Sequence, residues 1–285
     1  MQQTFPKPIP KPLAPLVAGL LLAGLAPALA EDTPATWTDQ QKEDFLLTAK
    51  VLGTQDLKVG VTGSQRATLE LGGHVHDAHV QTIDVAKRKS KVGAQTEVNF
   101  RDSFKYNIAA YRLDRMLGLG MVPVSVLRQH KREKAAVTWW IDDVQMSERE
   151  RVSQQMKPPK LGPWQEQLNR ALVFDQLVYN TDWNMSNLLI TDDWTMWLID
   201  FTRAFRIYKR LREPEKLRKI DADLLARLRS LEPQTVREEL KDVLTGPEIS
   251  GILGRRDAIV ELFDQRIAAH GSAAVLYGTR SRKQS

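Results

Sequence analysis

The chain has 285 residues, of which 42% are hydrophobic and 27% are charged, a composition typical of one large globular domain or two small ones. Lys and Arg number 41 and Asp and Glu 35, so the net charge of +6 favours anionic partners without indicating specific nucleic-acid binding. Cysteine is absent, which excludes thiol catalysis, thiolate metal sites and disulfides.

Residues 1–30 have the pattern of an export signal. Lysines precede an apolar run at 13–29, and a small-x-small sequence at 28–30 matches a signal-peptidase site. The alternative is a membrane anchor, but Pro15 and Pro27 interrupt a run shorter than the roughly 20 apolar residues that a spanning helix needs. We therefore expect a cleaved signal peptide, a mature chain without a transmembrane segment, and a periplasmic or secreted location.

The mature chain begins with a helix-like pattern in residues 31–56 that ends near Gly53. Short, partly alternating runs separated by glycines then predict a twisted antiparallel sheet, with strands at 58–61, 67–71 and 79–84. The basic residues 87–91 are expected to form a solvated loop.

Helical spacing returns at Ser103 and continues until Gly118 and Gly120, which are expected to end the helix. A strand at 122–127 follows, with a hairpin partner at 137–141. This completes a strand-rich N-terminal part, residues 31–150.

Residues 147–163 are polar and rich in Pro and Gly, which predicts a connector to a helical C-terminal part, residues 151–285. Most of that part has amphipathic helical spacing. Its segment 203–229 is strongly basic, which fits a solvated helix face or, alternatively, a docking groove.

The candidate catalytic and metal-binding residues lie in and just after one stretch, YNTDWNMSN at 179–187. Two short strands are expected after it, around a turn at 192–195, in a register that sets Asn187 opposite Asp200. Cross-strand neighbours have Cβ atoms about 5 Å apart, so the amide and the carboxylate can meet on one divalent cation. Asp182 lies five residues before Asn187, where it can accept a proton from a hydroxyl beside that cation.

This order of Asp, Asn and Asp resembles the protein-kinase-like superfamily. More narrowly, the segments NTDWNMSN, LIDFTRAF, FRDSFKYNIAAY and MVPV resemble bacterial relatives of the phosphatidylinositol 3- and 4-kinases, over residues 56–208. The resemblance implies an α+β, two-lobed fold with a small antiparallel-sheet N-lobe and a mainly helical C-lobe. It also implies phosphoryl transfer from ATP with Mg²⁺ or Mn²⁺.

Carried over to this sequence, the resemblance implies that Asp182 is the catalytic base and that Asn187 and Asp200 are metal ligands. It places Gly60 and Gly63 in a turn over the nucleotide phosphates. Ser64 ends that turn and belongs to the candidate nucleotide-binding residues. A plain hairpin turn is the alternative, because the sequence has no standard phosphate-binding glycine motif.

The sequence departs from the kinase pattern at one pair. Kinases place a Lys on a strand and a Glu on the next helix, whereas this chain has Gln81 and Asn107, which can hydrogen-bond to each other but carry no charge. Lys105 is a candidate substitute at the phosphates, with Lys87 and Arg101 as further choices. This departure motivates a second hypothesis, an exported pseudokinase or binding module without catalysis.

Two points stay open in the sequence. His74 and His76 share one face of a strand and permit a metal site, although structural histidines are the simpler interpretation. The acceptor is undetermined, since a protein, a lipid or a small molecule fits equally well.

Overall fold

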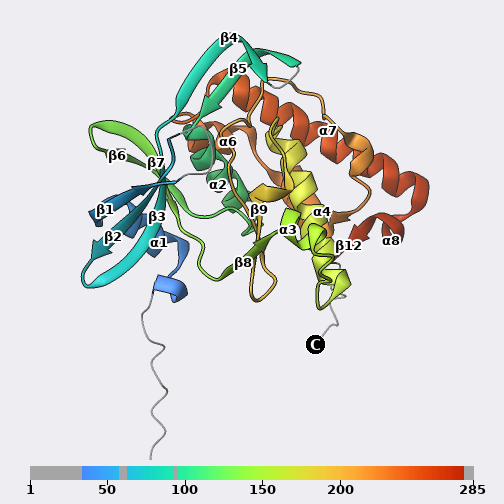
Figure 1. Cartoon of the computed structure of the whole chain (residues 1–285). Coiled ribbons are helices and arrows are strands. Elements are labelled where there is room, and N and C mark those ends of the chain that lie inside the picture. Colours follow the sequence, from blue (N-terminus) through green and yellow to red (C-terminus); the bar gives the residue numbers. More distant parts are fainter. Residues whose placement is uncertain (1–33, 58–62, 93–94, 279–285) are drawn as a thin grey trace, which may run out of the picture. The chain divides into compact units, whose positions relative to one another are not determined.

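The computed structural model describes residues 34–57, 63–92 and 95–278, without the side chains of residues 35 and 92–98. Helices and antiparallel strands are mixed along the chain (Figure 1). The helices are α1 Asp39–Thr48, α2 Lys105–Leu117, α3 Glu148–Ser153, α4 Leu161–Val178, α5 Ala222–Ser230, α6 Pro233–Leu240, α7 Gly246–His270 and α8 Ser272–Val275.

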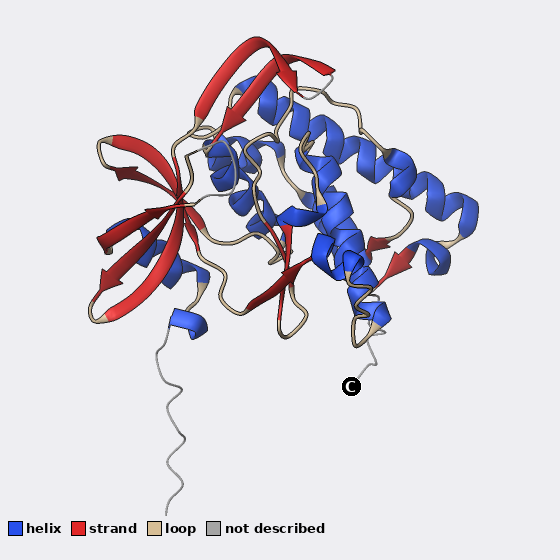
Figure 2. Ribbon diagram, in the orientation of Figure 1, coloured by secondary structure: helices blue, strands red, loops and turns tan. Residues whose placement is uncertain are grey.

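Five strands of the N-terminal part form an antiparallel sheet in the order β1-β2-β3-β7-β6 (Figure 2). They are β1 Lys50–Asp56, β2 Gln65–Leu71, β3 His74–Gln81, β6 Ser125–His130 and β7 Glu133–Trp139. The predicted turn between β2 and β3 is present, and Gly72 and Gly73 both have positive φ angles, which glycine adopts without steric cost. Helix α1 packs against β6 and β7 and buries Phe45 and Leu46.

Two predicted boundaries in this part are wrong. The first helix ends at Thr48 rather than near Gly53, because Val51 pairs with Leu69 of β2 and strand pairing overrides the local helical pattern. Residues 87–91 are strand rather than loop: they belong to the hairpin of β4 Asp84–Val92 and β5 Gln95–Ser103. The predicted strand at 58–61 lies outside the described residues.

Helix α2 confirms the predicted helix after Ser103. It ends at Gly118, which is left-handed as the sequence requires. The next turn is fixed by Asp114, whose buried carboxylate accepts hydrogen bonds from the backbone N–H groups of Gly120 (3.0 Å) and Met121 (3.1 Å).

The C-terminal part is mainly helical. Two of its strands form a three-stranded sheet with β8, which precedes residue 150, in the order β10-β9-β8. Its strands are β8 Val144–Ser147, β9 Leu188–Thr191 and β10 Met196–Leu198. A further short pair, β11 Ile220–Asp221 and β12 Leu276–Tyr277, is parallel. The predicted connector at 147–163 contains helix α3, and β8, which precedes it, pairs with β9, which follows it. No helix among the described residues is both long enough and apolar enough to cross a bilayer.

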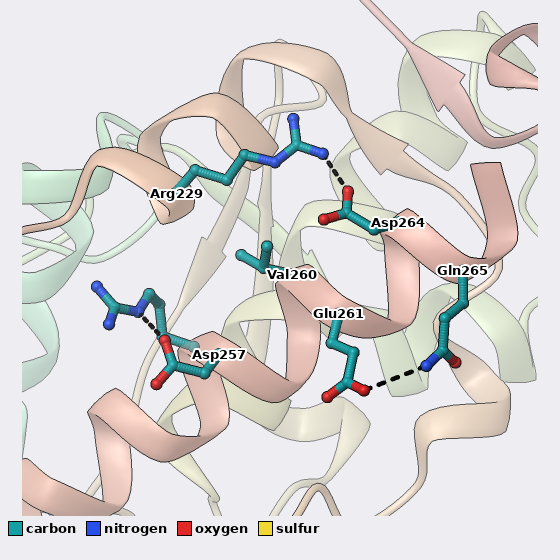
Figure 3. A pocket seen from close by; sticks show the side chains of 7 residues that line it. Arg229, Asp257, Val260, Glu261, Asp264 and Gln265 are labelled. Carbon is teal, nitrogen blue, oxygen red and sulfur yellow. Dashed lines mark hydrogen bonds and ion pairs between the residues drawn. The ribbon is translucent and has the colours of Figure 1, made fainter. Parts of the chain in front are cut away.

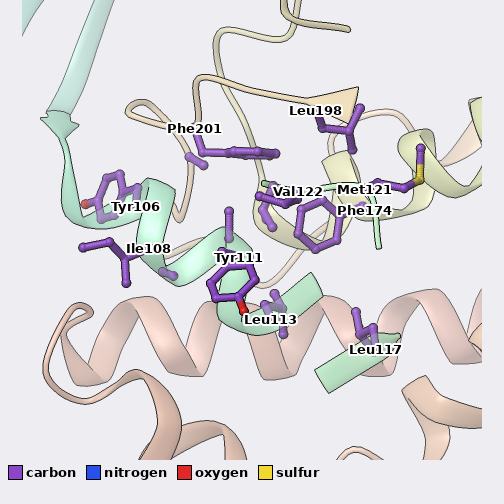
Figure 4. Close-up of a cluster of buried hydrophobic side chains, with 14 of the residues drawn as sticks. Tyr106, Ile108, Tyr111, Leu113, Leu117, Met121, Val122, Phe174, Leu198 and Phe201 are labelled. Atoms are coloured by element: carbon purple, nitrogen blue, oxygen red, sulfur yellow. The ribbon is translucent and has the colours of Figure 1, made fainter. Parts of the chain in front are cut away.

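The hydrophobic core connects helix α2 to the segment that carries Asp200. Ile108 and Leu117 of α2 are fully buried, and they belong to one cluster with Phe174 of α4, Leu198 of β10 and Phe201 (Figure 4). Because Leu198 and Phe201 are both buried, the chain on either side of Asp200 is held by packing.

Candidate active site

The loop after α4 fixes the backbone around Asp182. Tyr179 ends α4 in the left-handed conformation. The Asn180 side chain then accepts a hydrogen bond from the N–H of Asp182 (3.0 Å), and Asn184 Nδ2 donates to the carbonyl of Asp182 (3.2 Å). These bonds leave the Asp182 carboxylate exposed, as a group that meets a substrate must be.

The register of the β9–β10 hairpin differs by one residue from the predicted one. Leu188 pairs with Leu198, and the N–H of Ile199 donates to the carbonyl of Asn187 (3.0 Å), so Asn187 lies opposite Ile199 rather than Asp200. The cause is the turn, which is one residue tighter than expected because Trp194 adopts a positive φ of 65°.

Asp200 reaches the site by a backbone turn instead of by strand pairing. Its φ of 59° is left-handed, an uncommon conformation for a residue other than glycine. Thr202 Oγ1 donates to its Oδ1 (3.2 Å). The side chain is exposed to solvent on one side, yet desolvation by the surrounding protein raises the pKa of Asp200, and the charges of Asp182 and Asp102 raise it further.

Arg203 links the predicted base to the segment after Asp200. Its Nη1 lies 3.5 Å from Asp182 Oδ2, and its backbone carbonyl accepts hydrogen bonds from the N–H (3.2 Å) and the hydroxyl (2.9 Å) of Thr181. The sequence analysis missed this residue, since its spacing from Asp182 gives no local signal.

A buried hydrogen-bonded chain joins the predicted nucleotide residues to the predicted metal ligands. Gln81 Nε2 donates to Ser64 Oγ (3.4 Å), and Asn107 Nδ2 donates to Gln81 Oε1 (2.7 Å). Asn107 Oδ1 in turn accepts from the N–H of Phe201 (2.8 Å), next to Asp200. The expected bond between Gln81 and Asn107 is therefore present.

The other candidate nucleotide residues lie around this chain. Gly63 has a positive φ of 63° and precedes Ser64, whereas Gly60 lies outside the described residues. Lys105 begins α2 and forms an ion pair with Asp84 at the base of the β4–β5 hairpin (2.7 Å). None of these positions is tested as a nucleotide contact, so each stays a prediction.

The residues at Asp200 fit a divalent cation. The Asp102 Oδ1 atom is buried and has no hydrogen-bond partner among the described residues. Carboxylate and amide oxygens are the ligands that Mg²⁺ and Mn²⁺ prefer. The described residues contain no group of three His, Cys, Asp or Glu side chains placed to hold a metal, so an amide ligand is needed to complete such a site.

The histidine alternative is not supported as a metal site. His76 Nε2 contacts Asp142 (2.8 Å) and its ring stacks on Trp139 with centroids 3.7 Å apart.

A hollow of about 610 Å³ borders the site from the hairpin side. Cationic side chains and aromatic or apolar side chains line it, together with residues at the start of α7. The lining includes Lys87, Arg88, Phe100, Arg101, Phe205, Arg206, Ile207, Tyr208 and Glu248. Arg206 also donates to Thr181 Oγ1 (3.2 Å), the residue before Asp182.

A second hollow, of about 430 Å³, lies on the surface of α7 (Figure 3). Its charged groups pair with one another, Arg229 with Asp264 and Arg256 with Asp257. These two ion pairs satisfy the charges of both arginines locally.

Comparison with known proteins shows which solved structures the fold is similar to. No family model matches the chain, and no curated protein matches it in sequence. A structure of hydra Fam20 with sugar has a TM-score of 0.62 at 14% identity, over 82% of this chain and 90% of that chain. The Golgi casein kinase with Mn/ADP bound has a TM-score of 0.61 at 12% identity, over 84% and 78%. The Helicobacter pylori proinflammatory kinase CtkA has a TM-score of 0.54 at 10% identity, over 79% and 97%.

The fold is protein-kinase-like. The expected α+β class is confirmed, with an antiparallel sheet in the N-terminal part and a helical C-terminal part. At these identities the likeness concerns the fold alone.

Proposed function

We propose that the chain is a phosphotransferase that binds ATP with Mg²⁺ or Mn²⁺ and transfers the terminal phosphoryl group to a hydroxyl acceptor. The observation that carries the proposal is that Asp182 and Asp200 lie close enough for their charges to interact, on a kinase-like fold in which the carbonyl of Asn187 accepts a hydrogen bond from the residue before Asp200. The buried Ser64–Gln81–Asn107 chain reaches Phe201, the residue after Asp200. The Mn/ADP complex of the Golgi casein kinase supports the choice of ligands.

In this proposal Asn187 and Asp200 hold the cation, which neutralises charge on the nucleotide phosphates. Asp182 orients the acceptor hydroxyl and takes its proton. Arg203 Nη1, 3.5 Å from Asp182 Oδ2, pairs with that carboxylate and limits its rotation.

The hollow beside Arg206 is the proposed entrance for the acceptor. Its cations favour an acceptor with a negatively charged group, and its aromatic side chains allow an apolar portion to pack. A relationship to the phosphatidylinositol 3- and 4-kinases, and export through a signal peptide at residues 1–30, belong to the proposal as well.

A second candidate is a pseudokinase, which the neutral Gln81–Asn107 pair favours. ATP hydrolysis distinguishes the two, because water serves as acceptor when the natural one is unknown. We expect residues 31–285 to hydrolyse ATP with Mn²⁺, and Asp182→Asn to lower the rate about 100-fold or more while ATP binding persists. Hydrolysis that Asp182→Asn leaves unchanged would refute Asp182 as base, and metal-dependent binding without any turnover would favour the pseudokinase.

A further inference from the structure

The β4–β5 hairpin brings a buried carboxylate to the candidate active site. Asp102, near the end of β5, is 8% exposed, and its Oδ1 atom accepts no hydrogen bond from the described residues. A buried carboxylate oxygen that accepts no hydrogen bond is costly, so such an oxygen is expected to meet a cation. Neither the kinase pattern nor the sequence analysis assigns a role to this residue.

Backbone contacts place the end of β5 along the segment after Asp200. The N–H of Ser103 donates to the carbonyl of Thr202 (2.8 Å), and Arg206 Nη1 donates to the carbonyl of Arg101 (3.2 Å). Thr202 is itself bonded to Asp200 Oδ1. The residue between Arg101 and Ser103 is therefore held beside the turn that presents Asp200.

The side chain of Asp102 is on the strand face that meets this segment. Alternate residues of a strand share a face, so Asp102 lies on the same face as Phe100. The Arg203 guanidinium covers the Phe100 ring at 5.4 Å from its centroid. The negative charge of Asp102 is close enough to Asp200 to help raise the pKa of that carboxyl.

We propose that the Asp102 carboxylate is a third oxygen ligand of the divalent cation that Asn187 and Asp200 hold. This inference rests on the proposed function. Asp102 and Asp200 together carry two negative charges, which match a divalent cation, and the cation removes their mutual repulsion. Because Gln81 and Asn107 are neutral, they supply no positive charge to the nucleotide phosphates. The cation then supplies a larger share of that charge than it does in kinases with a Lys–Glu pair.

Titration with Mn²⁺ in the absence of nucleotide, followed by the electron paramagnetic resonance signal of free Mn²⁺, tests the proposal. We expect the wild-type chain to bind Mn²⁺, Asp200→Ala to lose binding, and Asp102→Asn to bind at least about tenfold more weakly. Asp84→Asn is the matched control, because Asp84 is an exposed carboxylate at the base of the same hairpin, paired with Lys105; its affinity should equal that of the wild type.

Wild-type affinity in Asp102→Asn, with binding still lost in Asp200→Ala, would overturn the role of Asp102 and leave the proposed function standing. Absence of Mn²⁺ binding in the wild type, even with ATP, would overturn both.

Thermal unfolding separates a metal ligand from a structural role. If Asp102 is a ligand, the metal-free Asp102→Asn variant is at least as stable as the wild type, because an unpaired buried charge is gone, and Mn²⁺ raises its melting temperature less. A metal-free variant that is less stable than the wild type would make Asp102 a structural residue and overturn the proposal.

Discussion

The side-chain oxygen of Asn107 accepts a 2.8 Å hydrogen bond from the backbone N–H of Phe201, the residue that follows Asp200. The same side chain donates to Gln81. The neutral amide of Asn107 on α2 therefore connects two elements. One is β3, which carries Gln81, and the other is the segment that carries Asp200, the predicted metal ligand. In kinases the corresponding strand and helix are connected by a charged Lys–Glu pair instead.

Replacement of Asn107 by Ala should destabilise the fold. The change removes two buried hydrogen bonds, the one that Asn107 donates to Gln81 and the one that it accepts from the Phe201 N–H, which costs about 2–4 kcal/mol of unfolding free energy. Denaturant unfolding measures the loss. Asn169→Ala, which removes an exposed bond on α4, should change stability by less than about 0.5 kcal/mol, and an equally small effect at Asn107 would contradict the account.

Restoring the charged pair should strengthen nucleotide binding. Gln81 lies between Ser64 and Asn107, so the double variant Gln81→Lys with Asn107→Glu sets an ammonium beside the predicted phosphate turn. We expect ATP to bind about tenfold more tightly, as one charge-assisted hydrogen bond provides. Unchanged affinity in a folded double variant would show that Gln81 does not face the phosphates. The single variant Gln81→Lys should be less stable, because its buried charge has no partner.

Asp114 should make stability depend on pH. Burial raises the pKa of Asp114 to about 7 in the folded chain, despite the hydrogen bonds from Met121 and Gly120 that favour the charged form. The folded state therefore binds a proton that the unfolded state has lost between about pH 4 and about pH 7, and this group's contribution to stability falls as pH rises through that window.

Asp114→Asn tests this expectation, because the asparagine side chain does not titrate and keeps one oxygen that can accept a hydrogen bond. Relative to the wild type, the variant should gain on the order of 2 kcal/mol of unfolding free energy between about pH 5 and about pH 8. A difference between the two proteins that is constant over this range would be inconsistent with the raised pKa.

Gly251 should not tolerate a side chain. A Cβ atom at this position of α7 would lie 2.7 Å from the carbonyl oxygen of Arg206 and 2.9 Å from Arg255 Nη1. Arg255 is fully buried and donates to the carbonyls of Leu177 (2.7 Å) and Arg206 (2.8 Å), so neither neighbour can move freely. Gly251→Ala should lose about 1–3 kcal/mol of unfolding free energy.

Gly53→Ala is the matched control for that variant, since no atom lies within 4 Å of the added carbon. Its unfolding free energy should stay within about 0.5 kcal/mol of the wild type. Equal losses in the two variants would contradict the close packing of α7 on the segment after Asp200.

The sequence was sufficient where local chemistry decides the structure. The turn at Gly72 and Gly73 and the left-handed end of α2 at Gly118 both depend on residue type and spacing. The kinase-like fold was expected from the resemblance of the segments around Asp182 and Asp200 to the protein-kinase-like superfamily, and comparison with solved structures confirms it.

Tertiary contacts decided what the sequence missed. The register of β9 and β10 depends on the left-handed Trp194, a conformation that tryptophan rarely adopts and that no sequence pattern predicts. The basic strand β4 has no apolar face to reveal it and is held by pairing with β5. Asp102 is placed by the β4–β5 hairpin, and Arg203 is placed by the turn after Asp200. The sequence spacing of Asp102 from Asp200, and of Arg203 from Asp182, therefore gives no indication that the two residues of each pair lie near each other.

Calorimetric titration of residues 31–285 with ATP, with and without Mn²⁺, tests the central claim most directly when it is repeated on Asp200→Ala. The account predicts ATP binding that requires Mn²⁺ in the wild-type chain and is lost in the variant, while the variant keeps the wild-type circular dichroism spectrum. ATP binding that is independent of Mn²⁺, or equal in wild type and variant, would contradict a kinase-type cation site at Asp200.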